Sequence, residues 1–150
     1  MTKQTPSLRE RALGYLTRRE YSRAELFRKL QPYAGDEDLD ALLDDFRQRG
    51  WLSDQRYVEQ MVHARRGKAG SLKLAHELRS RGISDALIVK AVAEFRQDEE
   101  TTARDLWRKK YGVPPATREE WARQARFLQG RGFGSELIRK LLRDCPEDND

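Results

Sequence analysis

The sequence contains few of the side chains that most catalytic and metal sites need. Its 150 residues include one cysteine, Cys145, and two histidines, His63 and His76. A single cysteine cannot form a disulfide within the chain, which is typical of a reducing compartment. The histidines fall on different predicted helices, and no cysteine pair or carboxylate stands at metal-ligand spacing beside them. The sequence therefore predicts no metal, no cofactor and no enzymatic activity.

The sequence also lacks the features of a membrane protein and of a nucleotide-binding site. No apolar run approaches the roughly 20 residues that cross a bilayer, and residues 1–13 have no apolar signal core. Neither of the common glycine-rich phosphate loops is present. We therefore expect a cytoplasmic protein without a membrane partner.

Two acidic pairs, Asp44-Asp45 and Glu119-Glu120, are the residues that a magnesium-dependent nuclease would use. Adjacent positions on a helix point about 100° apart, so neither pair converges by itself. A nuclease is therefore an alternative that requires divalent-dependent DNA cleavage, lost when Glu119 or Asp44 is changed.

Charge alternates in sign along the chain. Hydrophobic and charged residues each make up 37% of the sequence, so the apolar residues must be gathered into narrow helical stripes if a core is to form. The net charge is +5 for residues 1–33, −5 for 34–54, +5 for 55–92, −3 for 93–105, +7 for 106–143 and −4 for 144–150. Three basic blocks are each followed by an acidic one, which indicates a structural repeat.

An internal repeat is visible when residues 75–92 are placed over residues 125–142 without gaps. Seven of these 18 positions are identical, among them Arg81 with Arg131 and Gly82 with Gly132. A fainter first copy is offset by 48 or 49 residues. We predict an all-α, elongated tandem array of three three-helix repeats, with contacts mostly between neighbours. The predicted boundaries are residues 1–51, 52–96 and 97–145, followed by an acidic tail at 146–150.

Helix starts are indicated by capping residues. Ser7 with Glu10 and Ser22 with Glu25 have the spacing of reciprocal capping boxes, and predict helices over about 8–18 and 23–33. Further starts are predicted near residues 38, 53, 84, 98, 117 and 135. Most aromatic residues are in register with leucines and are expected in the core. Trp51 is expected to pack over the start of the helix that Ser53 caps.

Basic residues recur at equivalent places in the repeats and predict a shared anionic partner, either nucleic-acid phosphates or an acidic protein groove. These candidate binding residues are Arg18, Arg19, Arg23, Arg65, Arg66, Lys68, Lys73, Arg79, Arg81, Arg108, Lys109, Lys110, Arg126 and Arg131.

The order of several short motifs closely resembles that of RecX proteins. The resemblance covers about residues 10–143. Its motifs are Arg18-Arg19-Glu20-Tyr21-Ser22-Arg23-Ala24-Glu25-Leu26, Gly50-Trp51-Leu52-Ser53-Asp54, Lys68-Ala69-Gly70, Arg81-Gly82-Ile83 and Arg131-Gly132-Phe133. Ser71 stands where a proline is common in the family, and Tyr21 where a histidine is frequent.

The resemblance implies a non-enzymatic regulator that binds along the groove of the RecA–DNA filament. We expect it to be a monomer. Such proteins typically inhibit RecA in recombination, repair and the SOS response, and bind single- or double-stranded DNA weakly. The alternative is an independent DNA-binding regulator with a helix-turn-helix-like unit. The helix starts at residues 84–86 and 135–137 are acidic or apolar, which argues against their entering a DNA groove.

Overall fold

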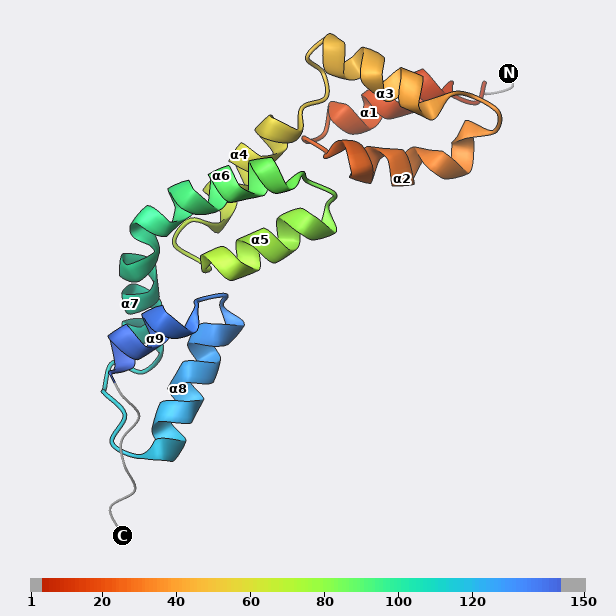
Figure 1. The fold of residues 1–150 in the computed structure, drawn as a ribbon. Helices are drawn as coiled ribbons and strands as arrows, with labels where there is room; N and C mark the ends of the chain where they lie inside the picture. The colour runs from red at the N-terminus through yellow and green to blue at the C-terminus, as the bar shows by residue number, and fades with distance from the viewer. Residues whose placement is uncertain (1–3, 144–150) are drawn as a thin grey trace.

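The protein was analysed as a computed structural model, which describes residues 4–143; Cys145 and the predicted acidic tail at 146–150 lie outside this range. Within it the chain forms nine α-helices and a short 3₁₀ helix, with no strand (Figure 1). The elements are α1 (Leu8–Leu16), α2 (Arg23–Ala34), α3 (Leu39–Gln48), α4 (Asp54–Arg65), α5 (Ser71–Ser80), α6 (Asp85–Phe95), η1 (Arg96–Asp98), α7 (Glu99–Lys110), α8 (Arg118–Gly130) and α9 (Ser135–Leu142).

The helices pack in consecutive groups of three, each around its own hydrophobic core. Leu26, Leu43 and Phe46 are buried in the first group, and Leu78 is buried in the second and Leu128 in the third. The groups follow one another as a curved, elongated molecule (Figure 1). The predicted all-helical array of three units is therefore confirmed, whereas the boundaries at 51/52 and 96/97 stay a prediction.

Most helix starts use the caps that the sequence predicts. The reciprocal box at Ser22 and Glu25 is complete: the serine hydroxyl accepts from the Glu25 N–H, and the carboxylate accepts from the Ser22 N–H. At Ser7 only one of the two bonds forms: its hydroxyl accepts from the Glu10 N–H, but the Glu10 carboxylate does not accept from the Ser7 N–H. The first helix accordingly has the weaker of the two predicted boxes.

Trp51 does not pack over the start of α4 as the sequence predicts. Its ring lies 5.6 Å from that of Phe46 in α3, and its side chain remains 41% exposed. The chain reverses at Gly50, which has a φ of 78°, and the Trp51 N–H donates to the Phe46 carbonyl. This turn returns the indole to the first unit.

The first and second units are joined at the N-terminus of α2. An Asp54 carboxylate oxygen accepts from the Arg23 N–H at 2.8 Å, and the Ser22 hydroxyl donates to the Arg81 carbonyl at 2.7 Å. A Cβ built on Gly82 would lie 2.4 Å from the Ala24 Cβ, so only glycine fits there without movement. The α5–α6 turn of one unit thus sits directly on the second helix of the preceding unit.

The second and third units are joined in the same way, at the N-terminus of α5. A Glu99 carboxylate oxygen accepts from the Ser71 N–H at 2.7 Å, and the Gly70 N–H donates to the Arg131 carbonyl at 2.7 Å. A Cβ on Gly132 would lie 2.4 Å from the Lys73 Cβ. The two junctions therefore share an acidic cap, a turn carbonyl and a glycine, and this repetition gives the molecule a regular curve.

Candidate partner-binding surface

The second helix of each unit, α2, α5 and α8, lies on the inner side of the curve (Figure 1). Helix α5 buries Leu74 and Leu78 within its own unit, where it contacts α4 and α6. Its exposed side carries Lys73, His76 and Arg79 at steps of three residues. These three side chains lie on the part of α5 that α4 and α6 leave uncovered.

Five of the predicted binding residues already have acidic partners within the molecule. Four of these pairs join separate helices or units, or fix a helix start, so their basic members support the fold. The pair of Arg66 joins two exposed side chains and contributes little. The pairs and their N–O distances are Arg19–Glu25 (3.2 Å), Arg23–Asp44 (2.7 Å), Arg65–Glu77 (2.9 Å), Arg66–Asp98 (3.8 Å) and Arg81–Glu25 (3.2 Å).

Glu25 is the acidic centre of the first junction. Its side chain is 9% exposed and contacts both Arg19 and Arg81. Burial raises the pKa of this carboxyl, but the hydrogen bond from the Ser22 N–H and the two guanidinium charges outweigh burial and leave the pKa below its usual value. The carboxylate therefore stays charged and holds two of the predicted binding residues in structural positions.

The remaining predicted residues are exposed and take part in no ion pair within the part of the chain that the structure describes. They are available to an anionic partner in a way that the paired residues are not. They are Arg18, Lys68, Lys73, Arg79, Arg108, Lys109, Lys110, Arg126 and Arg131.

Two of these cations, from separate segments, lie over the ring of Phe127 in α8, and a third, Lys68, stands in the neighbouring loop. The Arg131 guanidinium carbon lies 5.5 Å from the ring centroid, and the Lys110 Nζ lies 6.0 Å from it. Arg131 also donates to the Lys68 carbonyl at 3.5 Å, which places the α4–α5 loop beside the α8–α9 turn. We call Lys68, Lys110 and Arg131 with Phe127 the Phe127 cluster.

The Phe127 cluster brings the charges of Lys110 and Arg131 to one ring, and neither has an ion-pair partner among residues 4–143. Positive side chains held close together repel one another, and the ring face offsets only part of this cost. An anion bound between them would remove the repulsion, since each contact to it would be charge-assisted. The cluster is therefore suited to bind phosphate groups or acidic side chains.

The sequence-based selection missed exposed cations on two of the inner helices. Arg123 lies three residues before Arg126 on α8 and lines a shallow pocket with Tyr111 and Gln124, and Arg28 is exposed on α2. Helical spacing from Arg126 is a signal that could have identified Arg123. For Arg28 the repeat alignment offers a signal, because its equivalents at offsets of 48 and then 50 residues are His76 and Arg126.

Between residues 4 and 143, no three histidine, cysteine or acidic side chains come together in a way that could hold a metal ion. In the same range, every helix is too short or too polar to span a lipid bilayer.

Sequence comparison establishes the family. Family models described as the first, second and third three-helix domains of RecX match residues 9–38, 53–92 and 98–142. The chain belongs to the RecX family. It is 46% identical over 145 residues to the regulatory protein RecX of Leptothrix cholodnii, covering 96% of this chain and 92% of that protein. It is 43% identical over 150 residues to the protein of the same name from Chromobacterium violaceum, covering 99% and 97%.

Solved structures agree with this assignment at the level of the fold. The crystal structure of RecX from Lactobacillus salivarius matches with a TM-score of 0.77 at 18% identity, over 90% of this chain and 92% of that one. A second RecX crystal structure matches with a TM-score of 0.76 at 21% identity, over 89% and 70%. The RecX resemblance drawn from the motifs is therefore confirmed, and so is the curved array of helical units.

Proposed function

We propose that this protein is a cytoplasmic, monomeric regulator of RecA that binds along the groove of the RecA–DNA filament and inhibits the recombinase. The single observation that carries this proposal is membership of a family whose relatives are named regulatory protein RecX. The Phe127 cluster supports it, because a filament of DNA and protein offers the anionic groups that this cluster lacks. The curved array of units would follow such a filament.

The inner side of the curve would face the filament. Helix α5 lies there and carries the exposed Lys73, His76 and Arg79, and the Phe127 cluster lies where the second and third units meet. Several modest contacts of this kind sum to an affinity that falls steeply as salt rises. Inhibition would follow because a protein in the groove blocks the movement of the second DNA strand. The same cations would give weak binding to free DNA.

The proposal is tested by titrating this protein into single-stranded-DNA-dependent ATP hydrolysis by RecA at two salt concentrations. We expect suppression near stoichiometric ratios that weakens at the higher salt. A folded protein that leaves RecA hydrolysis and filament binding unchanged would overturn the proposal. Strong binding to DNA alone, with no effect on RecA, would favour the independent DNA-binding alternative.

A charge-matched pair of variants tests the surface itself. Changing the three cations of the Phe127 cluster together to glutamate should weaken suppression by about tenfold or more, because each lost contact is charge-assisted. The control makes the same charge change at exposed positions outside the cluster and should change suppression much less. The test set is Lys68, Lys110 and Arg131, and the control set is Arg47, Arg96 and Arg139. Equal losses in both would remove the Phe127 cluster from the interface.

A further inference from the structure

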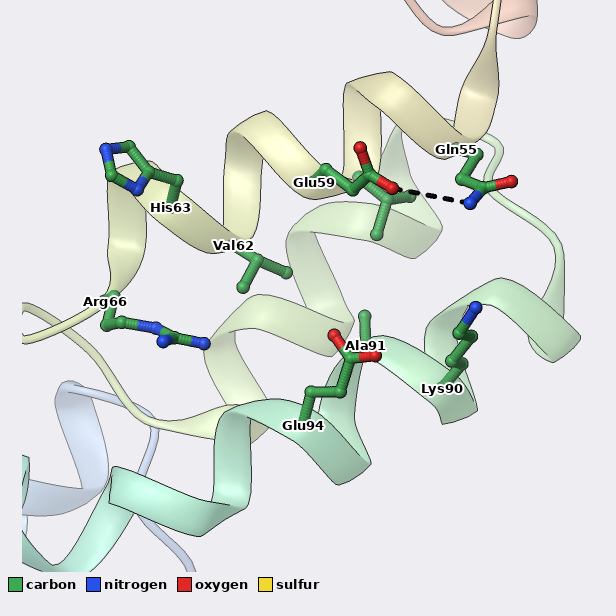
Figure 2. Close-up of a pocket in the computed structure, with 9 residues that line it drawn as sticks. Gln55, Glu59, Val62, His63, Arg66, Lys90, Ala91 and Glu94 are labelled. Atoms are coloured by element: carbon green, nitrogen blue, oxygen red, sulfur yellow. Dashed lines mark hydrogen bonds between the residues drawn. The ribbon is translucent and has the colours of Figure 1, made fainter.

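A groove runs between α4 and α6 of the second unit (Figure 2). Its volume is about 270 Å³, and its floor is formed by Val58, Val62 and Ala91. Figure 2 shows Lys90 and Glu94 reaching from α6 toward α4 across this floor. The groove thus combines an apolar floor with charges of both signs, Lys90 and Glu94 on α6 and Glu59 and Arg66 at α4.

The corresponding helices of the first and third units are tied together by an ion pair. Ala12, Val58 and Ala103 are the buried residues at the equivalent place in the first helix of each unit. We call the position three residues before each of them the latch position, because in the outer units its side chain forms this ion pair. In the first unit it holds Arg9, which pairs with Asp45 of α3 at 3.1 Å.

In the third unit the latch position holds Glu100, which pairs with Lys140 of α9 at 3.0 Å. The hydrogen bond and the charge of Lys140 lower the pKa of the Glu100 carboxyl below its usual value. Each outer unit therefore closes the space between its first and third helices with opposite charges.

The second unit lacks this ion pair, although its third helix carries charged residues at the equivalent positions. The latch position holds the neutral Gln55, whose amide donates to Glu59 on its own helix at 3.4 Å. Lys90 is the repeat equivalent of Lys140, and Glu94 of Asp45. Neither Lys90 nor Glu94 has an ion-pair partner among residues 4–143. The groove is therefore open, with two unmatched charges at its edge.

We propose that this groove receives an amphipathic helix of a protein partner, which under the proposed function is the RecA subunit. The helix would lay an apolar side chain on Val58 and Val62, with a carboxylate at Lys90 and a basic group at Glu94. This is helix-in-groove recognition, with anchors one turn apart on both helices. Nucleic acid is disfavoured, because the two carboxylates of the lining, Glu59 and Glu94, balance its two cations, Arg66 and Lys90.

The test rebuilds the latch. Gln55→Glu places a carboxylate opposite Lys90, as Glu100 stands opposite Lys140, and so closes the groove. Gln60→Glu makes the same charge change on the same helix, outside the groove lining. We expect Gln55→Glu to bind the RecA filament on single-stranded DNA about tenfold more weakly than wild type, a loss of ~1.4 kcal/mol. Gln60→Glu should bind within about twofold of wild type.

A second measurement reports the contact with RecA directly. A photo-crosslinking benzoylphenylalanine at His63, an exposed residue in the lining of the groove, should form a covalent product with RecA in the filament. This product should disappear in the Gln55→Glu background. Crosslinking to the DNA strand, or none to RecA, would overturn the groove assignment.

The outcomes separate this inference from the proposed function on which it rests. If wild type binds the filament and Gln55→Glu binds equally well, the groove is wrong and the regulator proposal stands. If wild type itself fails to bind, both proposals fall.

Discussion

Replacing Gly132 with alanine should break the junction between the second and third units. Gly132 has a φ of 96°, and its added Cβ would lie 2.4 Å from the Lys73 Cβ and 2.7 Å from the Lys73 backbone nitrogen. The Lys73 backbone belongs to α5 and cannot move independently of that helix. The substitution would therefore also disturb the hydrogen bond from the Leu72 N–H to the Gly132 carbonyl, which is 3.0 Å long.

The expected cost follows from three contributions. A positive φ costs an alanine roughly 1–2 kcal/mol, and forced overpacking costs roughly 1–3 kcal/mol. Loss of a backbone hydrogen bond adds about 1 kcal/mol. We expect Gly132→Ala to lower the free energy of unfolding by about 4 kcal/mol, since all three act at one site.

Gly50→Ala is the matched control for this prediction. Gly50 has a φ of 78°, but nothing lies within 4 Å of its added Cβ, so only the backbone strain remains. Urea unfolding followed by circular dichroism should show a loss of roughly 1 kcal/mol for Gly50→Ala. In Gly132→Ala the third unit should also unfold at lower urea than the first two, because neighbour contacts stabilise repeat units. Equal losses in the two variants would refute the close-packed junction.

Three other changes test separate parts of the molecule. Glu99→Ala leaves the buried Ser71 N–H without its acceptor and should cost about 2 kcal/mol in urea unfolding, whereas Glu99→Gln, which keeps an acceptor oxygen, should cost less than half as much. Because the pKa of Glu25 is lower in the folded protein than its unfolded value of about 4.3, its carboxylate stabilises the fold above that pH, and this stabilisation is lost as the pH falls through the folded pKa. Glu25→Gln should therefore flatten the decrease in melting temperature as the solution is acidified. Changing the three exposed cations that end α7, Arg108, Lys109 and Lys110, to glutamate should weaken binding to the RecA filament about tenfold and leave the helicity measured by circular dichroism unchanged. Unchanged inhibition would remove these residues from the interface.

Much of the fold could be predicted because helices and their ends depend on local sequence. The hydroxyls of Ser22, Ser53 and Ser84 accept from the third N–H of their helices, as their spacing predicts. The offset of 50 residues between Arg81-Gly82 and Arg131-Gly132 indicated the repeat, since the same buried positions recur at that spacing. The error at Trp51 arose because a turn at Gly50 set its direction.

The candidate site was predicted less completely, because exposure and pairing depend on residues far apart in the chain. The predicted basic residues look alike in the sequence, but Arg81 forms an ion pair with Glu25 across 56 residues. Lys68, Lys110 and Arg131 come from a loop, a helix end and a turn, and no local pattern joins them.

The sequence by itself determined the all-helical class, the repeat and the excess of cations, because helix periodicity, capping and charge are properties of short segments. Only the tertiary structure decided which cations are free and that the two junctions use the same contacts. It also decided that the second unit is open where its neighbours are latched. These features depend on the distance between side chains on different helices, such as Glu100 and Lys140, which packing alone sets.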